Sequence, residues 1–163
     1  MLGQALAANY GREARDLRTE ALGKGVEGAR AALETFYFAF NNRSLEALAA
    51  VWAPDPSVSL ANPLGGILTG AEEISALYRR IFEGTARVWV EYHDIVEFAS
   101  GDAVLFAGRE RGEFRTDRET VPLAIRTSRY FRRRDSAGWR QVHHHGSIDD
   151  AALLARYQKA VRG

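Results

Sequence analysis

Three consecutive histidines, His143, His144 and His145, offer proton-transfer chemistry near neutral pH, because an imidazole titrates at a pKa of about 6.5. They lie in the stretch R-Y-F-R-R-R-D-S-A-G-W-R-Q-V-H-H-H-G-S, residues 129–147. Aromatic and β-branched residues on either side of the turn residues 134–138 predict two paired strands. The histidines therefore belong to a strand of the fold.

Alternation of side chains along this strand divides the histidines between its two faces. His143 and His145 are expected on one face, and His144 on the other. Trp139 and Gln141 have the parity of the first face. An imidazole that faces a pocket is suited to act as a general base.

Asp94 is the carboxylate that we pair with the histidines as acid and base. It shares the parity of Val90 and Tyr92, which predicts a buried acid with a raised pKa. The alternative is an acid at the end of a strand that is paired with an arginine.

Two histidines on one face also have the geometry of a metal site. His143 and His145 would bind a metal ion if His93 or Glu91 supplied a third ligand from a neighbouring strand. The alternative is that the imidazoles form hydrogen bonds across the sheet or a dimer contact. We expect this structural role, with no metal and no cofactor.

Arg109 and Arg129 alternate with apolar residues in two predicted strands. An arginine on a core-facing surface is costly unless it is paired or binds an anion. We therefore predict a pocket for a small carboxylate or another anion. The alternatives are ion pairs with Glu110, Glu113 or Asp94, or arginines that point out of the sheet.

Composition sets the class of the protein. The chain has 163 residues, a formal net charge of +1 and no cysteine. This length fits one domain, and the charge favours neither nucleic acid nor an acidic membrane surface. The lack of cysteine excludes disulfides and thiolate chemistry. No stretch is apolar for long enough to span a membrane, and we expect a cytoplasmic protein.

The periodicity of apolar residues changes once along the chain. We divide it into an N-terminal helical extension over 1–25, helical from about 2 to 22, and a main domain over 26–163. The extension is expected to be either an arm that packs on a partner or a loose segment. Helical spacing predicts three helices in the main domain, and alternation then predicts four strands. The predicted helices cover 26–41, 44–52 with Ser44 as N-cap, and 70–84. The predicted strands cover 87–98, 103–114, 120–134 and 139–147.

A last helix is predicted from about residue 148. Ser147 and Asp150 have the spacing of a capping box, with aspartate in place of glutamate. Three helices, a run of antiparallel strands and a terminal helix define an α+β domain with helices on one face of the sheet.

Four motifs occur in an order that resembles a known superfamily. They are F-Y-F-A-F-N-N-R-S-L-E-A-L-A-A-V-W-A-P-D, T-G-A-E-E-I, S-G-D-A-V and the stretch that contains the histidines. Over about Ala29 to Ser147 the chain resembles nuclear-transport-factor-2-like (NTF2-like) proteins, in particular the SnoaL-like group related to ketosteroid isomerases. The resemblance implies a cone-shaped fold, with N-terminal helices packed in a curved antiparallel sheet. It also implies a deep pocket and a homodimer formed through the sheet.

The chain also resembles the association domain of calcium/calmodulin-dependent kinase. That domain has pocket arginines at the positions of Arg109 and Arg129. It shares the pattern W-x-x-V-H-x-H-x-S found at residues 139–147. Gly146 stands where the domain has a further arginine, so the match is partial.

Ordinary ketosteroid isomerase chemistry is rejected. That reaction needs an aspartate base, and a tyrosine with a protonated aspartate as oxyanion hole. Residues 57–63, which correspond to the base region, contain no carboxylate. The tyrosine position falls on Phe36, with Tyr37 beside it, and the acidic position falls near Thr127 or Arg129.

Three functions of different classes follow from these residues. The first is a pocket that binds a small acidic or hydrophobic metabolite, and two inward arginines would favour it. Its expected lining is Arg109, Arg129, Tyr37, Trp52, Tyr78 and His144. The second is a SnoaL-like isomerase, cyclase or dehydratase, favoured by an inward histidine near a carboxylate. The third is a dimeric assembly module, favoured by Trp89 or Trp139 on the convex face of the sheet.

Overall fold

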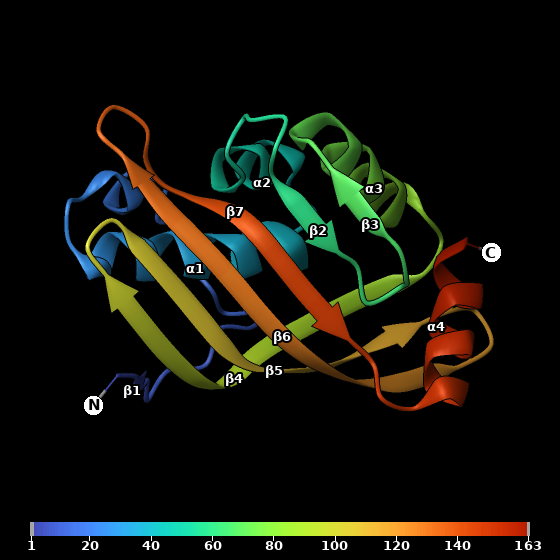
Figure 1. The fold of residues 1–163 in the computed structure, drawn as a ribbon. Helices are drawn as coiled ribbons and strands as arrows, with labels where there is room; N and C mark the ends of the chain where they lie inside the picture. The colour runs from blue at the N-terminus through green and yellow to red at the C-terminus, as the bar shows by residue number, and fades with distance from the viewer. Residues whose placement is uncertain (1, 163) are drawn as a thin grey trace.

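A strongly curved sheet wraps around one buried helix in this α+β structure (Figure 1). The computed structural model describes residues 2–162. The elements in chain order are β1 (Gln4–Ala5), a 3-10 turn (Glu20–Leu22), α1 (Val26–Asn41), α2 (Leu45–Val51), β2 (Ser59–Ala61), β3 (Ile67–Thr69), α3 (Ala71–Glu83), β4 (Arg87–Ser100), β5 (Ala103–Arg115), β6 (Thr120–Arg134), β7 (Gly138–Ser147) and α4 (Ala151–Arg162).

The sheet has seven strands in the order β1-β4-β5-β6-β7-β2-β3. All neighbouring pairs are antiparallel except β2 with β7, which is parallel. The four long strands β4 to β7 are the predicted ones, and they follow one another in space as in sequence. The short strands β2 and β3 extend the sheet beside β7, with α2 and α3 close to them (Figure 1).

Helix α1 fills the concave side of the sheet because it is apolar around most of its circumference. Eleven of its sixteen residues are buried, as expected for a core helix. The predicted start of α2 is confirmed, since the Ser44 hydroxyl accepts a hydrogen bond from the Ala47 N–H at 3.1 Å. None of the helices within residues 2–162 is long and apolar enough to cross a membrane.

A bulge in β4 reverses the side-chain alternation that the sequence predicts. The pairing with β5 shifts between His93 and Val96, and Asp94 has a positive φ of 52°. Before the bulge Tyr92 faces the core, whereas after it the inward residue is Ile95. Phe98 has the parity of Tyr92 and would share its face in an unbroken strand, but it is 40% exposed. A bulge adds one residue, so every later side chain changes face.

A second bulge lies in β7, immediately before the histidines. The pairing with β6 shifts so that Gln141 lies opposite Phe131 and His143 opposite Tyr130. Val142 is therefore the extra residue. His143 and His145 still lie on the face opposite His144, but the prediction that these two share the face of Trp139 and Gln141 is wrong, because His144 does. Trp139, Gln141 and His144 are the buried side chains of this strand.

The N-terminal segment, predicted to be helical over 2–22, is mostly an extended arm. The Leu6 N–H donates to the Ile95 carbonyl at 2.9 Å, and Tyr10 exchanges two backbone hydrogen bonds with Tyr92. The apolar residues of this segment do pack against the core, namely Leu6, Tyr10, Ala14 and Leu17. Backbone pairing with the otherwise open edge of β4 outweighs a weak helical periodicity.

The last helix begins later than its predicted cap. Ser147 lies in β7, where its hydroxyl accepts a hydrogen bond from Arg126 Nε at 3.3 Å. Asp150 caps α4 instead, because its Oδ1 accepts a hydrogen bond from the Leu153 N–H at 2.9 Å.

Gly28 allows Trp139 of β7 to pack against the first turn of α1. A Cβ there would lie 2.6 Å from Cδ1 of Trp139 and 2.7 Å from the Gly23 carbonyl oxygen.

We expect Gly28→Ala to lower the free energy of unfolding by roughly 1–3 kcal/mol through overpacking, although alanine is the better helix former. Chemical denaturation of wild type and variant measures this difference in the free energy of unfolding. Gly25→Ala is the control, since a Cβ there meets nothing within 4 Å, and equal losses in both variants would contradict the packing argument.

Candidate functional site

A buried ion pair forms the floor of the candidate site. Arg129 of β6 is 1% exposed, and its Nη2 lies 2.9 Å from Oε1 of Glu110 on β5. Its Nε donates to the Tyr37 hydroxyl at 2.9 Å, and its Nη1 donates to Oε1 of Gln141 at 3.0 Å. The Tyr37 hydroxyl in turn donates to Glu110 at 2.6 Å. The alternative that Arg129 pairs with Glu110 is therefore confirmed.

Strand alternation and α1 together place this arginine inside the domain. In β6 the inward side chains are Ile125, Thr127, Arg129 and Phe131. The guanidinium carbon lies 3.6 Å from the ring centroid of Phe36 on α1, a favourable cation–π contact. Because charges are costly to bury, the carboxylate and the aromatic ring are what make this position stable.

The pKa values of Tyr37, Tyr78 and Arg129 all lie above their ordinary values. Burial is the main cause that raises the pKa of the Tyr37 hydroxyl well above its ordinary value, with Glu110 adding to it. Burial raises the pKa of Tyr78 to about 12, against an opposing effect of Arg129. Burial alone would lower the pKa of Arg129, but Tyr37 and Glu110 outweigh it and hold that pKa above its ordinary value. At neutral pH the tyrosines are neutral and the arginine is charged.

His144 is the buried imidazole of the site. It lies opposite Arg129 across the β6–β7 ladder and is 4% exposed. Neither Nδ1 nor Nε2 has a hydrogen-bond partner within residues 2–162. Burial first, and then the charge of Arg129, lower the pKa of His144 well below its ordinary value. The ring is therefore neutral, with one nitrogen able to donate and the other able to accept.

A small cavity lies between the ion pair and the surface. Its volume is ≈ 40 Å³, room for a few water molecules. The polar side chains that reach it are Glu110, Arg129, His144, Tyr78, Tyr157 and Asn62, and the rest of the lining is apolar. Two wider surface grooves, of ≈ 700 and ≈ 710 Å³, flank the N-terminal arm and contain none of the predicted catalytic or ligand-binding residues.

The structure brings together several of the predicted ligand-binding residues. Arg129, Tyr78 and His144 line the cavity, and Tyr37 lies behind Arg129. Trp52 is buried beside Gln141, and its Nε1 has no partner among the described residues.

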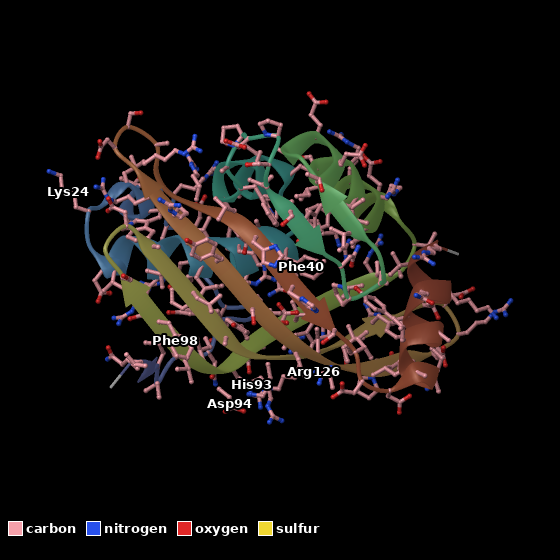
Figure 2. All side chains as sticks on the ribbon, in the orientation of Figure 1. Lys24, Phe40, His93, Asp94, Phe98 and Arg126 are labelled. Atoms are coloured by element: carbon pink, nitrogen blue, oxygen red, sulfur yellow. The ribbon has the colours of Figure 1, made fainter. Side chains whose placement is uncertain are left out.

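Two predicted residues lie outside the site. Arg109 is exposed on the outer face of β5, one residue from the inward Glu110, so the inward placement predicted for it is wrong. Asp94 is exposed at the bulge of β4, with His93 Nδ1 3.1 Å from its Oδ2. The predicted burial of Asp94 is therefore also wrong. Figure 2 shows His93 and Asp94 at the outer edge of the sheet.

His143 and His145 also lie outside the cavity. His143 Nδ1 is 2.7 Å from the Ser59 hydroxyl, which is a hydrogen bond to the neighbouring strand β2. His145 is exposed. Strands β5 and β6 separate both from His93 and Glu91, and no three potential metal ligands come together among residues 2–162.

Sequence reasoning did not name Glu110, Gln141 or Tyr157 as members of the site. Glu110 has the parity of Phe106 and Phe114, and this pattern would have placed it inward. Gln141 and His144 share a face only because of the β7 bulge, for which the sequence has no clear signal. Tyr157 reaches the cavity from α4, which no local pattern predicts.

Comparison with known proteins places this geometry in a family. The profile of the SnoaL-like domain matches residues 29–151. The chain belongs to the SnoaL-like family. The NTF2-like fold predicted from the motifs is thereby confirmed. No curated protein matches the sequence.

Solved structures agree with this assignment. A candidate association domain of calcium/calmodulin-dependent protein kinase type II from Thiobacillus denitrificans is 35% identical, with a TM-score of 0.60, over 74% of this chain and 94% of that chain. A candidate NTF2-like dehydratase from Streptomyces avermitilis is 25% identical, with a TM-score of 0.70, over 77% and 96%. The kinase hub from S. rosetta, 16% identical with a TM-score of 0.64 over 74% and 94%, shares the fold.

His144 makes stability depend on pH. Its pKa is lower in the folded protein than in the unfolded chain, so the unfolded chain binds more protons below about pH 6.5. The stability that depends on a neutral His144 is fully present above that pH. It is lost as the pH falls towards the pKa of His144 in the folded protein. We expect wild type to lose up to roughly 1.4 kcal/mol of unfolding free energy per pH unit between pH 6.5 and 5 relative to His144→Gln.

Urea denaturation at a series of pH values measures this slope. His145→Gln is the matched control, because His145 is exposed on the other face of the strand, and it should keep most of the wild-type slope. Parallel pH profiles for wild type and His144→Gln would contradict a buried neutral His144.

Proposed function

We propose that this SnoaL-like protein binds a small, neutral, mostly apolar ligand that carries a hydroxyl or carbonyl group. The observation that carries this proposal is the buried His144 ring, which reaches the cavity with both nitrogens unpartnered among the described residues. Buried polar groups are normally paired. A ligand group that hydrogen-bonds to the imidazole would satisfy it.

The charge balance of the site favours a neutral ligand over an anion. Glu110 offsets the charge of Arg129, and all three side-chain nitrogens of that arginine already donate to protein groups. Arg109, the second arginine of the anion hypothesis, is on the other face. Most of the remaining lining is apolar, including Phe36, Phe40, Leu60, Leu77, Ile81, Val90 and Ile125.

Binding is better supported than catalysis by this geometry. Neutral His144 has the lone pair that proton abstraction needs, and one relative is named as a candidate dehydratase. However, no carboxylate within residues 2–162 hydrogen-bonds to His144 to orient it and stabilise its protonated form. Asp94, the predicted partner, is exposed at the bulge of β4.

Three probes with one ring system test the ligand class: 2-naphthol, 2-naphthoate and naphthalene. Binding to the native state raises the melting temperature. We expect 2-naphthol to raise it most and 2-naphthoate least, because a carboxylate would lose its hydration without meeting a free cation. His144→Leu should weaken 2-naphthol binding about 2–10-fold, the effect of one hydrogen bond.

Naphthalene is the control, because it cannot use the imidazole and should bind wild type and His144→Leu alike. If 2-naphthoate binds most tightly, the site is for anions and the proposal is wrong. If the His144→Leu substitution weakens naphthalene as much as 2-naphthol, the histidine only shapes the cavity.

We also propose that the outer face of the sheet forms a homodimer. Phe98, Leu105, Tyr130 and His143 lie opposite one another in a cross-strand row over β4, β5, β6 and β7. Phe98 is 40% exposed and the other three are half-buried. Trp139 is buried inside rather than on this face. Relatives named as an association domain and a hub support self-association.

Leu105→Lys tests this dimer, because it places a charge in the middle of the row. We expect wild type to elute with the mass of a dimer in size-exclusion chromatography with light scattering, and Leu105→Lys as a monomer. Thr120→Lys, at an exposed position at the end of β6, should remain a dimer. A monomeric wild type, or a dimer that Leu105→Lys leaves intact, would contradict the proposed interface.

A further inference from the structure

Helix α4 closes the end of the domain at which the cavity lies. It follows the last long strand and packs across the end of the curved sheet, near the β5–β6 turn (Figure 1). Tyr157 is its one buried residue, at 4% exposure, and it lines the cavity. Its ring stacks on Phe114 of β5 at a centroid distance of 5.4 Å. The family match ends at residue 151, so this wall of the cavity lies outside the matched region.

Few polar interactions hold α4 in place. Gln158 Nε2 donates to the Leu64 carbonyl at 2.6 Å, and Arg162 Nη2 donates to the same oxygen at 3.3 Å. Arg156 forms an ion pair with Glu119 at 2.6 Å in which both side chains are about half exposed, and such a pair contributes little. Leu153, Ala160 and Val161 of α4 also pack against the core, but they are only partly buried, and Tyr157 is the one side chain of the helix that is buried.

The size of the cavity requires that some wall moves. The cavity volume of ≈ 40 Å³ is far below the 300–1,000 Å³ typical of ligand pockets. The walls from α1 and the long strands are part of the core and carry the Arg129–Glu110 pair. By contrast, α4 has one buried residue out of twelve. Weakly attached elements of this kind open locally at low free-energy cost.

We propose that α4 is a cap that opens to admit the ligand, and that Tyr157 limits the size of the ligand that the closed site holds. This inference rests on the proposed function, since it concerns access to the same cavity. When α4 moves away it also releases Leu64, which lines the cavity and whose carbonyl oxygen accepts the hydrogen bonds from Gln158 and Arg162. Asp150 caps α4 at its first turn, so the helix moves as a unit about residues 148–150.

Hydrogen exchange of the full chain, without ligand, tests the opening. We expect the amides of α4 to exchange at least tenfold faster than those of β6, and Gln158→Ala to accelerate exchange in α4 and the residues around Leu64 only. Lys159→Ala is the matched control, because Lys159 is an exposed neighbour on the same helix. If α4 exchanges only together with β6, it is a fixed part of the fold and the proposal is wrong.

Association kinetics of 2-naphthol test the gating. Loss of one hydrogen bond of about 1 kcal/mol raises the open population about fivefold. Gln158→Ala should therefore raise the association rate constant about fivefold, and Lys159→Ala should not change it. Tyr157→Ala should raise the affinity for the larger neutral probe 2-anthrol, whereas Tyr157→Phe should not.

The outcomes separate this inference from the proposed function. Faster exchange of α4 in Gln158→Ala with no binding of any probe would overturn the ligand class but support the cap. Binding of 2-naphthol at equal rates by wild type and Gln158→Ala would overturn the cap and leave the proposed function in place.

Discussion

The ion pair between Arg129 and Glu110 is the interaction on which the interior of this domain depends. Each charge would cost several kcal/mol to bury alone, so the pair is stable only with its partners in place. Those partners come from separate elements: Tyr37 from α1, Glu110 from β5 and Gln141 from β7. The pair therefore fixes the register of the long strands against one another and against the central helix.

The same pair decides what the cavity can recognise. Each of the three side-chain nitrogens of Arg129 already donates a hydrogen bond to a protein group, and the charge of Arg129 helps to keep His144 neutral. A site that contains an arginine thus offers no net positive charge, and the imidazole of His144 at the cavity has both nitrogens unpartnered among residues 2–162. This is why the geometry favours a neutral ligand over the anion that an arginine in a core strand first suggests.

Elements outside the matched family region, 29–151, complete the domain at both ends. The N-terminal arm covers the edge of β4, where exposed backbone groups would otherwise pair with another chain. Helix α4 covers the cavity with Tyr157. Both elements are attached to a core that already has its ion pair and its aromatic packing, so each is able to vary without disturbing that core.

The sequence by itself determined the family, the boundaries of α1 to α3, the four long strands and the inward direction of Arg129. These features depend on apolar periodicity, caps and turns, which act over a few residues. The tertiary structure decided the rest. Two bulges reversed the faces of the histidines and of Asp94, because one extra residue inverts a period of two. The N-terminal segment became an arm because the edge of β4 offers backbone partners that are distant in sequence. Tyr157 joins the site from α4 through contacts between separate elements, and no local pattern specifies such contacts.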